Sequence, residues 1–181
     1  MKRYILTGAP GSGKTAILRQ LEREGFGVVE EAATDVIALE QAQGIAEPWT
    51  RDAFIDTVAE LQRRRLQRAP AAPDCVQFHD RSIVCTRALA AYLGFAVSDL
   101  LVREMERVIR EAIFEKKVFF IRNLGFVEPT AARQISFEET LRFERMHEEA
   151  YREAGFELVA IEPGPVQQRA AAIVAALPEA R

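Results

Sequence analysis

Short runs rich in apolar residues alternate along this chain with longer segments in which apolar residues recur every three or four positions. The short runs cover residues 4–6, 26–31, 75–80, 118–122 and 156–161. Runs of this length, bounded by glycine, proline or polar residues, are typical of strands, and the run VFFIR is apolar enough to be buried on both faces. The segments between them have the spacing of amphipathic helices. This alternation predicts an α/β fold in which a parallel sheet is covered by helices on both faces.

Capping residues mark the start of several predicted helices. The first helix is expected over residues 13–24, and the chain from the second strand to Thr50 is expected to be a connecting segment. Thr50 and Ser98 are predicted to cap two further helices, and Ser136 forms a capping box with Glu139. The helix after Ser136 is predicted to turn inward a face made of Phe137, Leu141, Met146, Ala150 and Ala154.

Composition narrows the class of protein and of partner. With 181 residues, of which 49% are apolar, the chain is expected to form a single domain over residues 1–181 with one sizeable core. A net charge of −3 with 28% charged residues does not favour binding to nucleic acid or anionic lipid, so small molecules are the expected partners. No window reaches the roughly 18 apolar residues of a membrane span, and the N-terminus lacks the apolar core of a signal peptide. We therefore expect a cytoplasmic protein, with its oligomeric state left open.

The stretch GAPGSGKT, between the first strand and the first helix, matches the phosphate-binding motif G-x-x-x-x-G-K-[ST] at every fixed position. Backbone amides must turn inward around an anion in such a loop, and side chains at Gly8, Gly11 or Gly13 would obstruct that wrap. The following helix adds unpaired donors and a partial positive charge at its N-terminus. The residues predicted to bind the nucleotide are Gly8, Ala9, Pro10, Gly11, Ser12, Gly13, Lys14 and Thr15.

Two side chains of this loop have separate predicted roles. Lys14 is expected to reach the β and γ phosphates, and the Thr15 hydroxyl is expected to ligate Mg²⁺. The predicted cofactors are therefore ATP and Mg²⁺. The motif does not distinguish an adenosine from a guanosine nucleotide.

Charged residues follow the second and third predicted strands, whose carboxyl ends share one sheet edge with the phosphate loop. Asp80 is predicted to hold Mg²⁺ opposite Thr15, with an ordinary helix N-cap as the alternative. Glu31 is the candidate base for the attacking hydroxyl or an anchor for substrate, and the alternative is a solvated acid at a strand end. Asp35 shares a face with Glu31 if a helix starts at once, which makes it a further substrate-binding candidate. Arg81 is expected either to hold a substrate group or phosphate, or to pair with a neighbouring acid.

The segment FVEPTAARQISFEE follows the fourth strand and reads as a loop before a strongly capped helix. An arginine on such a loop can offset the charge that develops on a transferred phosphoryl group. Arg133 is our candidate for that role. The predicted catalytic residues are thus Lys14, Glu31, Asp80 and Arg133.

These features together resemble the P-loop kinases. The resemblance rests on the phosphate loop, on VVEEAA after strand two, on HDRS after strand three, and on the arginine-bearing segment before a long charged helix. The chain looks most like the ribosylnicotinamide-kinase-like branch that is often grouped with AAA-type ATPase domains. The resemblance implies a three-layer sandwich around a five-stranded sheet of order 2-3-1-4-5. It also implies that Glu31 approaches the acceptor hydroxyl, that Asp80 and Arg81 act as an acid–arginine pair, and that Arg133 contacts phosphates.

The function predicted from these residues is a Mg- and ATP-dependent transfer of the γ-phosphoryl group to a hydroxyl of a small nucleoside-like metabolite. The alternative is a regulatory module that binds ATP or GTP and hydrolyses it slowly. A Ras-like GTPase is less favoured because Asn123 does not begin an N-K-x-D element. A motor-type AAA+ ATPase is less favoured because the chain is short for the usual added helical domain. The identity of the acceptor is left open.

Overall fold

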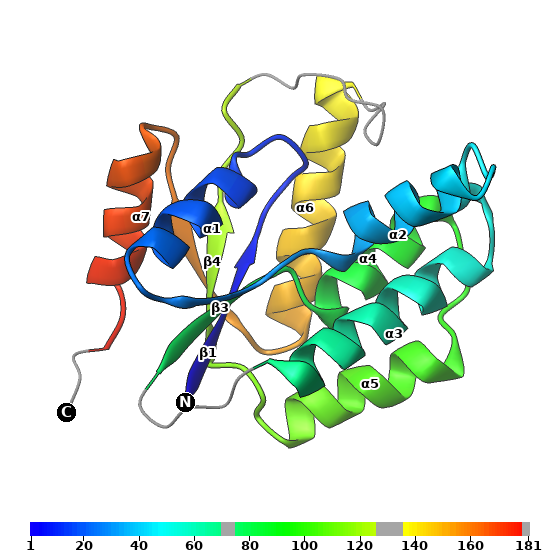
Figure 1. The fold of residues 1–181 in the computed structure, drawn as a ribbon, viewed down its shortest axis with the longest axis horizontal. Coiled ribbons are helices and arrows are strands. Elements are labelled where there is room, and N and C mark those ends of the chain that lie inside the picture. Colours follow the sequence, from blue (N-terminus) through cyan, green and yellow to red (C-terminus); the bar gives the residue numbers. More distant parts are fainter. Residues whose placement is uncertain (70–74, 126–135, 179–181) are drawn as a thin grey trace.

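Five parallel strands form a single sheet at the centre of the computed structural model, which describes residues 1–69, 75–125 and 136–178 (Figure 1). The strands are β1 (Lys2–Thr7), β2 (Gly27–Val29), β3 (Val76–Asp80), β4 (Lys117–Ile121) and β5 (Glu157–Ile161). Their order is β2-β3-β1-β4-β5, and every neighbouring pair is parallel. The predicted fold class and strand order are confirmed.

Helices cover both faces of the sheet. The helices are α1 (Lys14–Arg23), α2 (Ala32–Ala42), α3 (Ala53–Arg68), α4 (Ile83–Leu93), α5 (Asp99–Arg110), α6 (Phe137–Glu153) and α7 (Val166–Ala175), with a short 3₁₀ helix η1 (Pro48–Thr50). The α1 and α7 helices pack on one face, and α2 to α6 supply the cluster on the other face (Figure 1). The molecule is therefore a three-layer sandwich.

Alternation along β1 places apolar side chains in both layers. Tyr4 and Leu6 pack with α1 and α7, whereas Ile5 packs with the helices of the opposite face. All three side chains are at most 1% exposed. A central strand that is buried on both faces needs such a continuous apolar run, which explains why β1 could be located from sequence.

Two local predictions before α3 are wrong. Part of the expected connecting segment forms α2, because its apolar residues include Ala32 and Val36, which are buried in the core beside α3. Thr50 belongs to η1 rather than capping α3, whose N-cap residue is Asp52. The α2 sequence carries alanines and apolar residues on several sides, so it lacks the single apolar stripe that marks an amphipathic helix.

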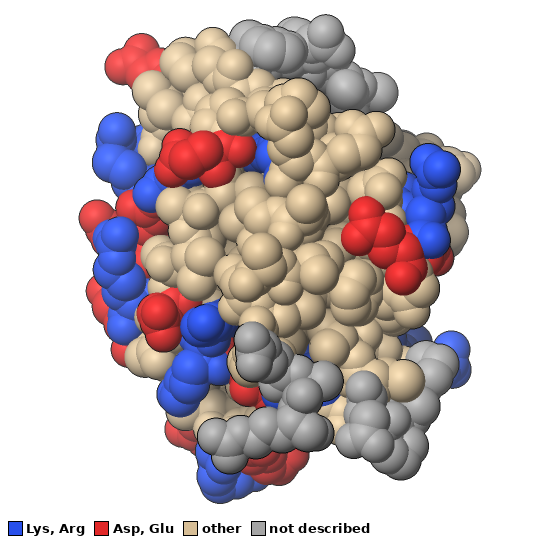
Figure 2. All heavy atoms as spheres, turned by 90° about the vertical axis from the view of Figure 1, so that its left-hand side faces the viewer, with Lys and Arg blue, Asp and Glu red and all other residues tan. Residues whose placement is uncertain are grey.

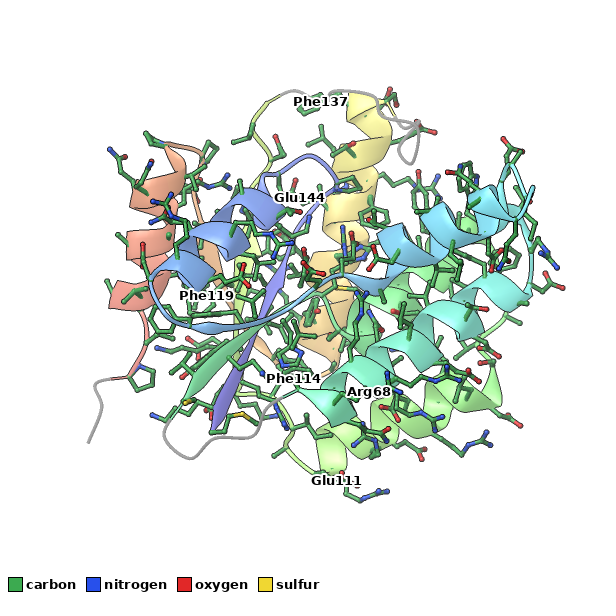
Figure 3. The ribbon with its side chains drawn as sticks, viewed as in Figure 1. Arg68, Glu111, Phe114, Phe119, Phe137 and Glu144 are labelled. Carbon is green, nitrogen blue, oxygen red and sulfur yellow. The ribbon has the colours of Figure 1, made fainter. Side chains whose placement is uncertain are left out.

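The inward face of α6 also differs from the prediction. Phe137 is 39% exposed at the start of the helix, which Figure 3 shows near the upper end of the molecule. Of the predicted face, Ala150 is buried, and the other buried residues of α6 are Thr140, Phe143, Glu144, His147 and Tyr151. Glu144 accepts hydrogen bonds from Arg122 (3.1 Å) and from Asn123 (2.7 Å), the two residues that follow β4. Polar residues on the buried face misled a prediction that relied on apolar spacing alone.

The surface carries charges of both signs. On the face that Figure 2 shows, the described Lys and Arg side chains are interspersed with Asp and Glu around a broad area of other residues. No helix among the described residues combines the length and the apolar character that crossing a bilayer requires.

Candidate active site

The phosphate loop connects the end of β1 to the start of α1, as the motif predicts. Gly8, Gly11 and Gly13 have φ values of 136°, 81° and 87°, a region that favours glycine. A Cβ atom on Gly8 would lie 2.2 Å from the carbonyl oxygen of Ile121, so the loop packs directly against the end of β4. Gly13 is the N-cap residue of α1. The glycines thus shape a tight turn that ends at the donor-rich end of a helix.

Lys14 is held by the loop that it serves. Lys14 is only 7% exposed, and its Nζ donates to the carbonyl oxygens of Gly8 (3.1 Å) and Ala9 (2.8 Å). The third contact, to the Ser12 hydroxyl, is long at 3.4 Å. An ammonium group has three donors, so a phosphate would take the place of one of these acceptors, and the long contact to Ser12 is the weakest of the three. Burial, reinforced by the charge of Arg81, lowers the pKa of Lys14 to about 8, which still leaves it mostly protonated at pH 7.

A cleft of about 660 Å³ begins at the phosphate loop and continues between the helices. The loop contributes Pro10, Gly11, Gly13, Lys14 and Thr15 to its wall. The remaining wall residues come from α2, α3, α4, α6 and the η1 region, and they include Ile37, Trp49, Phe54, Val58, Gln62, Thr86, Leu89, Tyr92, Leu93, Phe143 and His147. One end of the cleft therefore suits an anion and the other suits an apolar or aromatic group.

Glu31 and Arg81 form an ion pair in the wall of this cleft. Arg81 Nε donates to Glu31 Oε1 at 2.5 Å, and the Thr34 hydroxyl donates to Glu31 Oε2 at 2.7 Å. Burial raises the pKa of Glu31, but the charges of Arg81 and then Lys14 outweigh burial and lower it overall. Arg81 has a φ of 70°, an uncommon conformation for a residue with a side chain. Both predicted residues are thus brought together beside the loop, with Glu31 held as a carboxylate.

Asp80 ends β3 and is 6% exposed. Its Oδ1 atom is buried and has no hydrogen-bond partner among the described residues. Burial raises the pKa of Asp80 to about 6, although the charge of nearby Lys14 acts in the opposite direction. Asp80 lines a separate small cavity of about 30 Å³, to which Arg81 also contributes, and not the large cleft.

The side chains of Asp80 and Thr15 suit a magnesium ion chemically. A buried carboxylate oxygen without a donor is electrostatically costly, and a cation relieves that cost. Mg²⁺ prefers oxygen ligands and binds through few protein groups, such as one carboxylate and one hydroxyl. Thr15 lines the cleft and directly follows Lys14 in the sequence. The positive charge of Lys14 acts on Asp80.

Asp35 does not join this group, and Arg133 lies outside the described residues. Asp35 is on α2 and forms an ion pair with Arg65 of α3, and it lies outside the wall of the cleft. A contact between Asp35 and substrate stays a prediction. Arg133 falls within residues 126–135, which lie outside the described part of the chain, so its role also stays a prediction.

Arg65 supports the site but was not among the site residues predicted from the sequence. Its guanidinium donates to the carbonyl oxygens of Glu30 (3.0 Å) and Glu31, and it pairs with Asp35. Arg65 therefore holds the corner between β2 and α2 that carries Glu31. The sequence could have indicated this role, because Arg65 continues the helical spacing of the buried residues on α3, and a charged residue is unusual at such a position.

The aromatic wall was also missed. Phe143 stacks on His147 with ring centroids 3.9 Å apart, and Tyr92 meets Phe143 edge-on at 5.3 Å. None of these three side chains was among the site residues predicted from the sequence. The spacing of Phe143, His147 and Tyr151 along α6 is the signal that could have placed them on one face.

Comparison with solved structures supports the same fold. NadR, solved in complex with NAD and AMP-PNP, superposes with a TM-score of 0.67 and 19% identity, covering 96% of this chain and 48% of the NadR chain. A deoxyadenosine kinase from M. mycoides, solved with the products dCMP and a flexible dCDP, superposes with a TM-score of 0.67 and 12% identity, covering 96% and 97% of the two chains. This chain thus spans about half the length of the NadR chain.

No curated protein matches the sequence at a significant level. The AAA domain family matches residues 3–169, which include the phosphate loop, Glu31, Asp80, strands β2 to β5 and all of β1 except Lys2. The chain therefore belongs to the AAA domain family and is a P-loop NTPase with a kinase-like fold.

Proposed function

We propose that this protein transfers the γ-phosphoryl group of ATP, as its magnesium complex, to a hydroxyl group of a small nucleoside-like metabolite. The observation that carries the proposal is the single cleft, which joins the phosphate loop to an aromatic chamber past Glu31 and Arg81. A module that only bound or hydrolysed a nucleotide would need the loop but no chamber beyond it. The structural neighbours, with the nucleotides bound to them, support this proposal as relatives in fold.

The acceptor end of the cleft favours a flat group attached to a polar one. Trp49, Phe54, Tyr92 and Phe143 supply aromatic surface there, and Gln62 and Thr86 supply polar atoms. Thr86 donates to the Gln62 amide oxygen at 2.7 Å, which fixes the orientation of that amide. A nucleoside has both a ring that can stack on such surfaces and hydroxyl groups that can accept a phosphoryl group.

Charged groups surround the position where transfer would take place. Lys14 can turn its weakest donor, now 3.4 Å from the Ser12 hydroxyl, to the phosphates, and Arg81 adds a second positive charge that acts on Lys14. Glu31 is kept ionised by Arg81, so it can orient the acceptor hydroxyl and accept its proton as the bond to phosphorus forms. Asp80 and Thr15 would hold Mg²⁺, which when bound offsets the negative charge of the phosphate oxygens.

The proposal is tested by measuring ADP release from Mg-ATP with and without each member of a panel of nucleosides. We expect one or more nucleosides to raise the rate, and Glu31→Gln to reduce that rise by roughly 100-fold while ATP binding is retained. Glu30→Gln is the matched control, because Glu30 is adjacent but pairs with Arg19 and lies outside the wall of the cleft. Lys14→Ala should abolish tight binding of the triphosphate.

The alternative function has its own signature in this assay. Slow hydrolysis at the same rate under every condition would contradict the kinase proposal and favour a regulatory NTPase. Retained triphosphate affinity in Lys14→Ala would contradict the assignment of the phosphate loop itself.

A further inference from the structure

A buried arginine from the last helix reaches the phosphate loop from behind. Arg169 lies in the first turns of α7, which packs beside α1 (Figure 1). The residue is 4% exposed, and its Nη1 donates to the carbonyl oxygen of Ser12 at 2.7 Å. Its Nη2 donates to the carbonyl oxygen of Arg122 at 2.9 Å, just beyond the end of β4. One guanidinium group therefore connects the phosphate loop, β4 and α7.

The hydrogen bond to Ser12 has a direct consequence for the shape of the loop. In a loop that wraps an anion, the amides face the anion, so the carbonyl groups turn outward and need donors when they are buried. Ser12 is completely buried, and Arg169 supplies a charged donor to its carbonyl group. A charged hydrogen bond of this length is among the stronger ones in proteins, so it can hold the peptide in one orientation.

The charge of Arg169 lies close to the start of α1. A Cβ atom on Gly13 would be 3.2 Å from Arg169 Nη1, so the guanidinium lies against the N-cap of that helix. The N-terminus of a helix already favours an anion. Arg169 adds a full positive charge behind the same position.

This arrangement is poorly suited to a purely structural role. Among the described residues, no carboxylate forms an ion pair with Arg169, and its Nε atom is buried without a partner. Burying a cation without a counter-charge is unfavourable. Glu162 acts on Arg169 through its charge but forms no ion pair with it, so a polyphosphate in the loop would supply negative charge that Arg169 otherwise lacks at close range among the described residues.

We infer that Arg169 is a positioning residue for the phosphate loop, which holds the Ser12 peptide outward and favours triphosphate over monophosphate ligands. The inference rests on the proposed function in one respect, which is that the loop binds a nucleoside triphosphate. Arg169 acts through the loop backbone and through its charge, and it touches neither the aromatic chamber nor the Glu31–Arg81 pair.

The test compares equilibrium binding of ATP and AMP, with GTP and GMP in parallel, to the wild-type protein and to Arg169→Met. We expect the substitution to weaken triphosphate binding by roughly 10- to 100-fold, because it removes a charged donor and a positive charge. Monophosphate binding should change by less than about threefold, since AMP lacks the phosphates that the loop surrounds. Arg110→Met, on the exposed surface of α5, is the control for the same change in net charge and should leave both affinities unchanged.

Arg169→Lys keeps the interpretation clear if the methionine variant does not fold. A lysine retains the charge but cannot donate to both carbonyl groups through one planar group, so we expect an intermediate loss of triphosphate affinity. Equal losses for ATP and AMP, or no loss for either, would overturn the inference. Failure of the wild-type protein to bind any triphosphate would instead overturn the proposed function.

Discussion

At the scale of single residues, the site combines groups that would be unfavourable in a protein without ligands. Among the described residues, Asp80 has a buried oxygen without a donor and Arg169 is a buried cation without an ion pair, and Arg81 has a left-handed backbone conformation. Each of these features costs stability in the unliganded protein. A charged ligand in the phosphate loop would offset part of the cost at Asp80 and Arg169.

The first prediction concerns Gly8, where space and backbone conformation both demand glycine. Gly8→Ala should lower the free energy of unfolding by roughly 3 kcal/mol or more, since the new methyl group would meet the Ile121 carbonyl oxygen and the φ angle is unfavourable for alanine. Gly44→Ala is the matched control, because Gly44 has a φ of 91° but nothing within 4 Å of the added atom. It should cost only about 1–2 kcal/mol. Urea denaturation measures both, and equal losses would show that the contact with β4 does not matter.

At the scale of elements, some helix starts are fixed by capping residues within the same few positions of the sequence, and others by contacts from a distant helix. The predicted capping box is confirmed: Ser136 Oγ accepts from Glu139 N at 3.2 Å, and Glu139 Oε2 accepts from Ser136 N at 2.7 Å. The N-cap role predicted for Ser98 is also confirmed, with Leu101 N donating to its hydroxyl at 3.2 Å. The corner before α2, in contrast, is held by Arg65 from another helix.

The second prediction concerns the cap of α6. Ser136→Ala should lower the free energy of unfolding by about 1 kcal/mol, because it leaves the Glu139 amide at the helix start without its acceptor. Thr57→Ala serves as the control, since Thr57 is exposed within α3 and its hydroxyl donates only to a carbonyl group of the same helix. Chemical denaturation of both variants checks the difference. A loss in Thr57→Ala as large as that in Ser136→Ala would mean that the cap contributes nothing specific.

At the scale of the whole molecule, stability depends on groups that folding keeps uncharged. His147 and His79 both have a pKa lowered to about 3, mainly by burial and then by the charges of Arg81 and Arg3 respectively. Below pH 6.5 the unfolded chain binds protons at these histidines that the folded protein does not bind. The free energy of unfolding therefore falls as the pH is lowered, by roughly 1.4 kcal/mol per pH unit for each histidine. Asp80 has the opposite effect on stability. Between its ordinary pKa and about 6, the folded protein binds a proton at Asp80 that the unfolded chain does not bind, which offsets about one of the two histidine protons.

The third prediction follows from this balance. His147→Gln should reduce the loss of stability between pH 7 and pH 5 by roughly 2 kcal/mol, because one of the two suppressed protonations is removed. His79→Gln should produce a similar change from a different part of the core. Urea midpoints at the two pH values provide the measurement. An unchanged pH dependence in both variants would contradict the neutral, buried state of these histidines.

Much of the site could be predicted because each of its parts is recognisable either from a short motif or from its position at the end of a strand. The phosphate loop is eight consecutive residues whose glycines, lysine and hydroxyl are each demanded by local geometry. Glu31, Asp80 and Arg81 could be placed because each lies at or just beyond the carboxyl end of a parallel strand, and such ends share an edge with the loop. The wrong inward face of α6 and the missed α2 mark the limit of apolar periodicity, which does not register buried polar residues or short helices apolar on several sides.

The sequence by itself determined the succession of the five strands along the chain, the phosphate loop and the caps at Ser98 and Ser136, because these depend on hydrogen bonds and apolar spacing within a few residues. Only the tertiary structure decided which distant groups support that loop and what shape the acceptor chamber has. Arg169 meets a carbonyl group 157 positions away, and Arg65 meets one 35 positions away. Such contacts depend on how whole layers pack, and no local pattern specifies the pairing of one buried arginine with one backbone oxygen.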